Sequence, residues 1–415
     1  MPRSQARRRQ GGPWSACYAG WRRDSAAAMS GKATPELTMK ACTGRSMPRS
    51  MRSLPMLLVA LLCAGCATRP PRPRPATVAS AAQPATEGGP PRVIARHGRF
   101  AVAPVQSAQA LRAAFVASLL HDHPELDRAH ILELLGDARV QPSILAAMER
   151  PAEARPWKDY RPIFLGRKRI DAGVAFYRRH RALIDGIAGR YGVPPSVLVA
   201  ILGVETYYGR QTGGYRVLDA LYTLAFHYPP RAAFFQKELA VFLSLPRSLL
   251  PGPRASLRGS YAGAMGWCQF MPSSFAAYAV SASGSGPADL WNSLPDILAS
   301  TAHYLAANGW QRGGPIARRA HVFARHEMPF LEHSAPIHNL AGLAARGFTL
   351  PGRKWPAATP ATLLQVQGRQ GPEYWVTFTN FQVITRYNSS PLYALAVTQL
   401  ADAIRRGVAP GGPRR

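Results

Sequence analysis

A single glutamate, Glu205, closes an eight-residue apolar stretch formed by residues 197–204. Pro194-Pro195 precedes this stretch, and Gly209 follows it closely. Proline suits the first turn of a helix and glycine its end. The pattern therefore predicts a helix that carries Glu205 near its C-terminus.

The helical repeat places Glu205 on one stripe with three aliphatic residues. Counting back by three, four and seven positions reaches Leu202, Ile201 and Leu198. Such a stripe aims the carboxylate at the core, where burial disfavours the charged form and raises the pKa of the carboxyl group, as a general acid near neutral pH requires. The alternative is a structural glutamate whose buried carboxylate is satisfied by an arginine or a hydroxyl.

The residues around Glu205 favour a chemical role in sugar binding. Between Ser196 and Phe275 the only other acids are Asp219 and Glu238. The same window is rich in Tyr, Phe, Trp, Gln, Ser and Gly, whose rings stack on sugars and whose polar groups bind sugar hydroxyls.

A second segment, residues 259–275, reads Gly-Ser-Tyr-Ala-Gly-Ala-Met-Gly-Trp-Cys-Gln-Phe-Met-Pro-Ser-Ser-Phe. We expect a loop leading into a helix, in which small residues let a polymer chain approach the backbone closely. Gln269 supplies both a donor and an acceptor there. Cys268 has no histidine near it in sequence, so we interpret it as a buried small thiol and not as a nucleophile.

Together with Val204-Glu205-Thr206 and Ile384-Thr385-Arg386-Tyr387-Asn388, the 259–275 segment resembles the membrane-bound lytic murein transglycosylase B family, glycoside hydrolase family 103. The resemblance extends from about Ala114 to Ile404. It implies a mainly α fold with a lysozyme-like catalytic core. It also implies cleavage of the β-1,4 bond between N-acetylmuramic acid and N-acetylglucosamine in peptidoglycan, without water, to give a 1,6-anhydromuramic end.

Ordinary glycosidases need two carboxylates, whereas this sequence offers only Glu205 in a suitable setting. One carboxylate suffices if the substrate's acetamido group stabilises the cationic carbon and its C6 hydroxyl then attacks. Glu205 would first give and later take the proton. The resemblance implies no cofactor.

The family pattern implies a set of residues that line the glycan groove. For Tyr160, Arg231 and Phe270, core packing or surface ion pairing is an equally good explanation. The implied substrate-binding residues are Tyr160, Arg231, Ser260, Met265, Gln269, Phe270, Tyr387 and Asn388.

One segment departs from the family pattern. Relatives carry an EF-hand-like loop with acids at alternate positions, but residues 281–292 here read Ser-Ala-Ser-Gly-Ser-Gly-Pro-Ala-Asp-Leu-Trp-Asn. Calcium needs several anionic oxygens, and only Asp289 remains. We therefore expect no metal site.

The chain has 415 residues, of which 51 are Lys or Arg and 22 are Asp or Glu, giving a formal net charge of +29. Only six of the basic residues are Lys, so the charge partly reflects a general bias toward Arg. The charge favours anionic partners such as phospholipid surfaces or cell-wall polymer. Nucleic-acid binding by a basic N-terminal arm is the competing interpretation, but that arm lacks interleaved aromatic residues, so we expect no nucleic-acid partner.

An export signal lies unusually far from the N-terminus. Residues 47–65 combine basic residues with a short apolar run, which is typical of a signal peptide. Leu62-Cys63-Ala64-Gly65-Cys66 resembles a bacterial lipobox, although Cys63 replaces the usual aliphatic residue. We expect Cys66 to be the acylated N-terminus, residues 1–46 to be absent from the mature protein, and residues 66–97 to form a Pro-rich tether.

These patterns predict a lipid-anchored periplasmic monomer, held at the outer membrane, with three folded parts. The expected parts are a helical subdomain at 98–170, a lysozyme-like core at 171–312 and 381–406, and a small β-containing insertion at 313–380. Two rivals stay open: a muramidase that hydrolyses the same bond with water, and a non-catalytic wall-binding scaffold.

Overall fold

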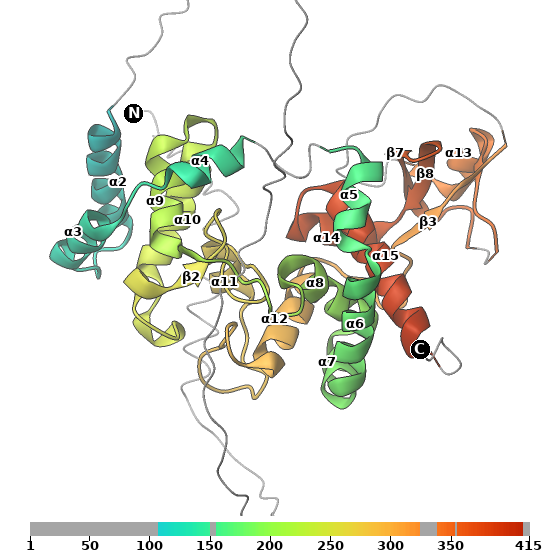
Figure 1. The fold of residues 1–415 in the computed structure, drawn as a ribbon, viewed down its shortest axis with the longest axis horizontal. Coiled ribbons are helices and arrows are strands. Elements are labelled where there is room, and N and C mark those ends of the chain that lie inside the picture. Colours follow the sequence, from blue (N-terminus) through green and yellow to red (C-terminus); the bar gives the residue numbers. More distant parts are fainter. Residues whose placement is uncertain (1–106, 150–154, 324–337, 353–354, 410–415) are drawn as a thin grey trace, which may run out of the picture. The chain divides into compact units, whose positions relative to one another are not determined.

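The computed structural model describes residues 107–149, 155–323, 338–352 and 355–409, which all lie in the compact unit Val105–Arg415. This part of the chain is mainly helical (Figure 1). The expected signal peptide, Cys66 and the tether lie outside it. The helices are α2 (Ala108–Asp122), α3 (Arg128–Asp137), α4 (Pro142–Met148), α5 (Trp157–Phe164), α6 (Arg167–Arg179), α7 (Arg181–Tyr191), α8 (Pro195–Thr206), α9 (Val217–His227), α10 (Ala232–Ser244), α11 (Pro272–Tyr278), α12 (Leu294–Ala307), α13 (Leu340–Ala345), α14 (Thr379–Tyr387) and α15 (Pro391–Val408).

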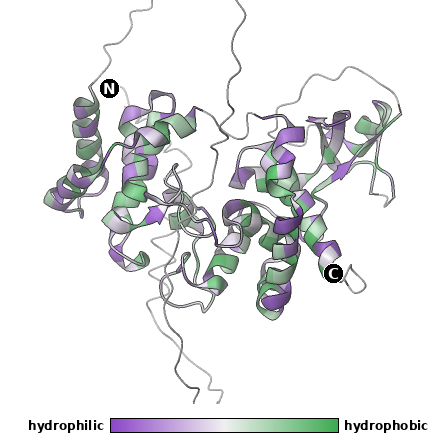
Figure 2. Ribbon diagram, in the orientation of Figure 1, coloured by the Kyte–Doolittle hydropathy of each residue, from purple (hydrophilic) through white to green (hydrophobic). Residues whose placement is uncertain are grey.

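Helix α8 is almost entirely buried. Residues 196–204 are all buried, because α6, α7, α12 and α15 pack around α8. Pro194 is its N-cap and Pro195 its first residue, as the sequence predicts. In Figure 2, α6 and α15 carry both hydrophobic and hydrophilic residues along their length, as expected for helices with one face toward the core.

The C-terminal helices α14 and α15 return to this core. Helix α15 packs against α5, α6 and α8, and Figure 1 shows it beside α6. Ser390 caps α15 by accepting a hydrogen bond from the Tyr393 N–H. The last helix thereby brings residues near 390 to the end of α8.

Helices α2 and α4 pack on α9, α3 packs on α2, and α9 packs on α10. A buried carboxylate joins these helices: Asp219 accepts hydrogen bonds from the Arg139 N–H at 3.0 Å and from Gln141 Nε2 at 3.2 Å. Asp219 also lies 3.5 Å from Arg216 Nη1. This acid is therefore fully engaged in holding the helices together.

The described strands form three small sheets. The largest is antiparallel, with the order β3-β8-β7-β5. Strand β7 contains the β-like run expected at Leu363–Val366, and β8 contains the run expected at Tyr374–Phe378 up to Thr377, because Phe378 already caps α14. A small separate core supports this sheet, with Phe348, Leu363 and Val376 among its members. The strands are β1 (Tyr215–Arg216), β2 (Arg258–Gly259), β3 (Ala317–Arg319), β4 (His321–Val322), β5 (His338–Asn339), β6 (Phe348–Thr349), β7 (Pro360–Gly368) and β8 (Gly371–Thr377).

Within the described ranges, no single helix has the length and apolarity to cross a bilayer. The strongly bent pair α7 and α8 meets the same criteria only when its two helices are taken together.

Candidate active site

Glu205 lies in the last turn of α8 and is half-buried. The three residues of the expected stripe, Leu198, Ile201 and Leu202, are each 0% exposed. The carboxylate thus stands at the rim of the core, with its helix anchored below it.

Tyr393 holds the carboxylate from the opposite side. Its hydroxyl donates a hydrogen bond to Glu205 Oε1 at 2.6 Å across 188 residues of sequence. Burial, followed by the nearby Glu205 charge, raises the pKa of Tyr393 well above its usual range, so the phenol remains a donor. Sequence reasoning missed Tyr393, because no local pattern pairs it with Glu205.

The backbone turns sharply directly after Glu205. Tyr207, Tyr208 and Gly209 have φ angles of 50°, 59° and 81°, in the left-handed region that favours glycine. A Cβ on Gly209 would lie 2.2 Å from the Trp267 ring. Two non-glycine residues in this region store backbone strain, which is typical of functional sites.

Two groups fix this turn. Thr206 Oγ1 accepts from the Gly209 N–H at 3.1 Å and lies 3.3 Å from the Trp267 carbonyl oxygen. Arg169 donates from Nη1 to the Gly203 carbonyl at 2.7 Å, and its guanidinium lies 4.7 Å from the Tyr207 ring centre. The end of α8 is therefore tied to α6 and to the 259–275 segment.

Gln269 also has a left-handed backbone, with φ 50°. Its Nε2 donates to the carbonyls of Gly266 at 2.8 Å and Thr212 at 3.2 Å. Ser260 Oγ accepts from the N–H groups of Ala262 and Ala264. The side chains of Ser260 and Gln269, which the sequence predicts to bind the ligand, are both half-buried. In this structure their hydrogen bonds stabilise the loop to which they belong.

The glycines of this loop serve its own close packing. A Cβ on Gly259 would lie 2.2 Å from the Ala264 carbonyl oxygen, and one on Gly266 would lie 2.5 Å from the Leu290 carbonyl oxygen. The sequence predicts that small residues let a polymer chain approach this loop. The structure shows that these two glycines are also required by contacts within the fold.

Tyr387 closes the site from α14. Its hydroxyl donates to the Cys268 carbonyl at 2.6 Å, and its ring stacks on Tyr393 with centres 6.5 Å apart. Burial of the hydroxyl end raises the pKa of Tyr387 well above its usual range. Burial likewise raises the pKa of the Cys268 thiol to about 12, so Cys268 is the inert thiol that the sequence predicts.

The second acid of the window, Glu238, is a structural cap. It is 5% exposed and accepts from Ser273 Oγ at 2.7 Å and from the Ser273 N–H at 2.9 Å, at the start of α11. Burial raises its pKa, and the two bonds from Ser273 oppose that shift. Glu238 and Asp219 are thus each bound to backbone elsewhere.

Three of the expected groove residues are core residues in this structure. Met265 is 0% exposed, Phe270 2% and Tyr160 1%. Met265 pairs through its backbone with Phe270, and the Phe270 ring packs on Tyr304 and Tyr387. In this structure their side chains are packed in the core beneath the site.

Arg231 and Asn388 line a pocket of about 730 Å³ beside the site. Arg231 is exposed, with its guanidinium 4.4 Å from the Phe234 ring centre. Asn388 follows α14 and accepts from the Ser390 N–H at 3.1 Å. The structure therefore groups Glu205, Gln269 and Tyr387 on one side, and Arg231 with Asn388 in the adjoining pocket.

Residues 281–292, at the position where relatives carry the EF-hand-like loop, are held by hydrogen bonds within the protein. Asp296 accepts from the N–H groups of Ala282 at 2.8 Å and Asp289 at 3.0 Å. The Asp289 carboxylate accepts from the Trp291 N–H at 2.8 Å. Among the residues with described positions, no group of three or more His, Cys, Asp or Glu side chains could hold a metal ion.

Comparisons with known proteins agree on one family. Residues 109–402 match the family described as "Transglycosylase SLT domain". Membrane-bound lytic murein transglycosylase B of Escherichia coli (strain K12) is 38% identical over 301 residues, which cover 70% of this chain and 81% of that protein.

Solved structures give the same result. Catenated lytic transglycosylase SltB1 of Pseudomonas aeruginosa is 43% identical, with a TM-score of 0.66 over 72% of this chain and 97% of that chain. SltB3 of the same organism, in complex with NAG-anhNAM-pentapeptide, is 30% identical, with a TM-score of 0.62 over 75% of this chain and 83% of that chain.

Proposed function

Because this chain belongs to the transglycosylase SLT domain family, we propose that Glu205 is its single acid and base. The protein is a peptidoglycan lytic transglycosylase with a mainly α, lysozyme-like fold. What we add is the assignment of that chemistry to residues of this chain.

In the proposed reaction, Glu205 gives its proton to the glycosidic oxygen as the bond from that oxygen to C1 of the muramic acid breaks. The carbonyl oxygen of the acetamido group stabilises C1. The C6 hydroxyl then bonds to C1 and returns its proton to Glu205. No water is consumed, and the carboxyl group ends as it began.

The observation that carries this proposal is that the other two acids of residues 196–275 already have structural partners. Asp219 and Glu238 are each bound to backbone N–H groups away from Glu205. A nucleophile or a base of the ordinary glycosidase kind would need a second carboxylate about 5–10 Å away from the first. Among the acids of residues 196–275, Glu205 alone has a half-buried carboxylate at the place where the 259–275 loop and Tyr387 meet α8.

The test is the chemistry of the products. Purified peptidoglycan digested by the protein should give muropeptides with 1,6-anhydromuramic ends by mass spectrometry. Reducing ends, heavier by one water, would assign the muramidase reaction instead. Binding without any soluble product would assign the scaffold.

We also propose that Ser260, Gln269, Tyr387 and Asn388 contact the glycan, with Arg231 further along. The Gln269 side chain supports this role because only its nitrogen, Nε2, bonds to protein groups, the carbonyls of Gly266 and Thr212. Its oxygen, Oε1, has no protein partner among the positions that the structure describes, so it is available to a ligand. The Tyr387 ring is half-buried at the same place.

The location of the protein is a further part of the proposal. A relative is named as membrane-bound. The lipobox-like sequence before Cys66, the signal-like residues 47–65 and the Pro-rich residues 66–97 support a periplasmic monomer that is lipid-anchored at the outer membrane.

A further inference from the structure

Positive charge is concentrated on α5, α6 and α15, and α15 packs against the other two helices. Together these helices contain nine Lys or Arg residues, three Asp and no Glu. Residues 107–149, which form α2 to α4 and their connections, have the opposite balance, with three Arg and six Asp or Glu. A general bias toward Arg would affect both parts alike, so it does not explain this difference.

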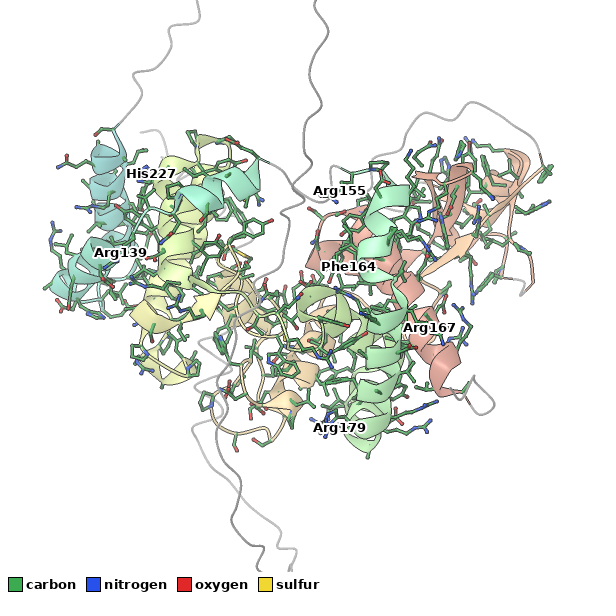
Figure 3. The ribbon with its side chains drawn as sticks, viewed as in Figure 1. Arg139, Arg155, Phe164, Arg167, Arg179 and His227 are labelled. Atoms are coloured by element: carbon green, nitrogen blue, oxygen red, sulfur yellow. The ribbon has the colours of Figure 1, made fainter. Side chains whose placement is uncertain are left out.

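The basic side chains of α6 lie on its solvent side. Lys168 and Arg179 are eleven residues apart, about three full helical turns, so they project from the same face of the helix. Both are exposed, whereas Gly173 and Tyr177 on the opposite face are buried. Figure 3 shows Arg167 near the beginning of α6 and Arg179 near its end. The positive charge therefore extends along the whole helix.

Two hydrogen bonds connect this side of α6 with the other two helices. Arg178 donates to the Gly407 carbonyl at 2.7 Å, so the end of α15 lies against the end of α6. Arg161 of α5 donates to Gln399 Oε1 of α15 at 2.9 Å. We define the basic face as the exposed Lys and Arg side chains of α5, of α6 and of the last turn of α15.

The fold neutralises only part of this charge. Asp171 pairs with Arg167, and Asp402 pairs with Arg405. Four other members of the basic face are exposed and form no ion pair with any residue whose position the structure describes: Lys158, Lys168, Arg179 and Arg406. The basic face is thus available to an anionic partner.

The basic face is separate from the proposed catalytic site. On the inner side of α6, Arg169 binds the Gly203 carbonyl of α8. On α15, Tyr393 binds Glu205 and lies thirteen residues before Arg406, which is roughly 20 Å along the helix. A partner on the basic face therefore leaves Glu205 free for its substrate.

An exposed aliphatic side chain adjoins the basic residues. Ile163, near the end of α5, is 40% exposed and lies between Arg161 and Arg167 in the sequence. Cations with an aliphatic group among them suit the boundary between phospholipid headgroups and acyl chains. An anionic wall polymer offers no such apolar layer, so the combination favours a membrane.

We propose that the basic face docks on a membrane surface that contains anionic phospholipids and leaves the catalytic site free. Arg and Lys bind the phosphate groups of lipids with charge-assisted hydrogen bonds. The inference goes beyond the proposed reaction and does not depend on Glu205. A lipid anchor at Cys66 would keep the effective concentration of the membrane high, so that weak contacts at the basic face suffice.

The test measures binding to vesicles by sedimentation, with Cys66→Ala in every variant so that acyl chains play no part. The vesicles consist of phosphatidylcholine alone or of equal amounts of phosphatidylcholine and phosphatidylglycerol. The parent protein should bind the mixed vesicles at least about tenfold more strongly, since each Lys or Arg near an anionic surface strengthens binding about fivefold. Replacing the four basic-face residues without ion pairs by Gln should weaken this binding at least about a hundredfold.

The matched control removes the same number of charges from other elements. It combines Gln substitutions at four exposed residues that also lack ion pairs in the described part of the chain: Arg128, Arg139, Lys237 and Arg318. Binding should fall less than about fivefold, because charges farther from the membrane than the Debye length of about 8 Å at physiological salt contribute little. A second variant exchanges Lys and Arg at the four basic-face positions and should retain binding.

Three results would overturn the proposal. Equal losses in the basic-face variant and its control would show that only the total charge matters. Loss of binding in the variant that exchanges Lys and Arg would show that the charge of the face is not the cause. Unchanged vesicle binding by the basic-face variant would reject docking, and loss of its sedimentation with insoluble peptidoglycan would then assign the face to the wall polymer.

The proposed function is checked separately by digestion of glycan strands without vesicles. Both Gln variants should release anhydromuropeptides at the rate of the parent, because none of the changed residues lies at the site. Normal release together with unimpaired vesicle binding by the basic-face variant would reject docking alone. Absence of anhydro products from the parent would reject the proposed function alone.

Discussion

The Glu205 carboxyl group stands at the rim of the apolar core, where the Tyr393 hydroxyl donates a hydrogen bond to its Oε1 at 2.6 Å. A group that must give a proton and then take it back has to keep its orientation toward the reacting oxygen through both steps. We interpret Tyr393 as the residue that holds Glu205 in that orientation.

The first prediction concerns Glu205→Gln. The amide keeps the size of the side chain but has no transferable proton, so turnover should fall by at least about 10²–10⁴-fold while folding and product binding persist. The measurement is the rate of release of anhydromuropeptides, with product affinity by calorimetry. Asp219→Asn is the control and should act through stability. Near wild-type turnover by Glu205→Gln would eliminate the single-carboxylate mechanism, and loss of the fold would favour a structural Glu205.

The second prediction concerns Tyr393→Phe, which removes one hydroxyl and keeps the ring. Without this donor the Glu205 carboxyl group loses the hydrogen bond that orients it. Therefore kcat should fall, while product affinity measured by calorimetry should stay close to that of the wild type. An unchanged kcat would show that the Tyr393 hydroxyl does not position Glu205.

At the scale of elements, the active site depends on how α8, α10, α14 and the 259–275 loop meet. Side chains of the three helices bond to the backbone of the 259–275 segment: Thr206 to the Trp267 carbonyl, Tyr387 to the Cys268 carbonyl, and Glu238 to the Ser273 N–H. These bonds tie the segment to all three helices.

The third prediction tests the cap of α11 by Glu238→Gln. Burial raises the pKa of Glu238 in the folded protein above the ordinary 4.5. A raised pKa contributes stability below 4.5 that is lost as pH rises through the folded value. Glutamine lacks this dependence, so its melting temperature relative to wild type should improve from below pH 4.5 to neutral pH. A difference that stays constant over this range would contradict the assigned shift.

The fourth prediction concerns the loop of residues 281–292. Asp296 and Asp289 hold it with hydrogen bonds to backbone N–H groups, and its serines supply no charge. Melting temperatures with calcium and with a chelator should therefore coincide. If calcium did bind, a concentration a hundredfold above its Kd would add about 2.7 kcal/mol to the free energy of unfolding and would raise the melting temperature. A rise of several degrees with calcium would show that backbone oxygens form a site.

At the scale of the whole molecule, charge and anchoring act together. The excess of Lys and Arg over Asp and Glu in residues 66–415 draws the protein toward anionic surfaces, and this attraction weakens as salt rises. A lipid anchor would hold the protein independently of salt. The two modes of attachment are therefore separable by experiment.

The fifth prediction is that Cys66→Ala releases the protein from membranes into the soluble fraction at physiological salt. The motivation is the apolar run that ends in Ala64-Gly65-Cys66. Fractionation of cells and the intact mass of the mature protein check it, and the wild type should carry acyl chains on Cys66 as its first residue. An intact mass that includes residues 1–46 would contradict the assigned start.

The sequence by itself determined the helix that carries Glu205 near its C-terminus, its apolar stripe and the β-like runs that lie in β7 and β8, because each depends on periodicity and turn residues close together in the chain. It also indicated the family through the 259–275 segment. These features depend on residues that are close together in the chain, so they can be recognised without knowledge of the fold.

The tertiary structure alone decided which side chains meet. Tyr393 reaches Glu205 across 188 residues, and no periodicity encodes that distance. The left-handed backbone at Gln269 goes with a loop whose Met265 and Phe270 are buried, so residues of one motif separate into core residues and half-buried residues at the site. The pocket of Arg231 and Asn388 likewise exists only where α5, β7 and the start of α15 converge, because a cavity is a property of packed surfaces and not of any one segment.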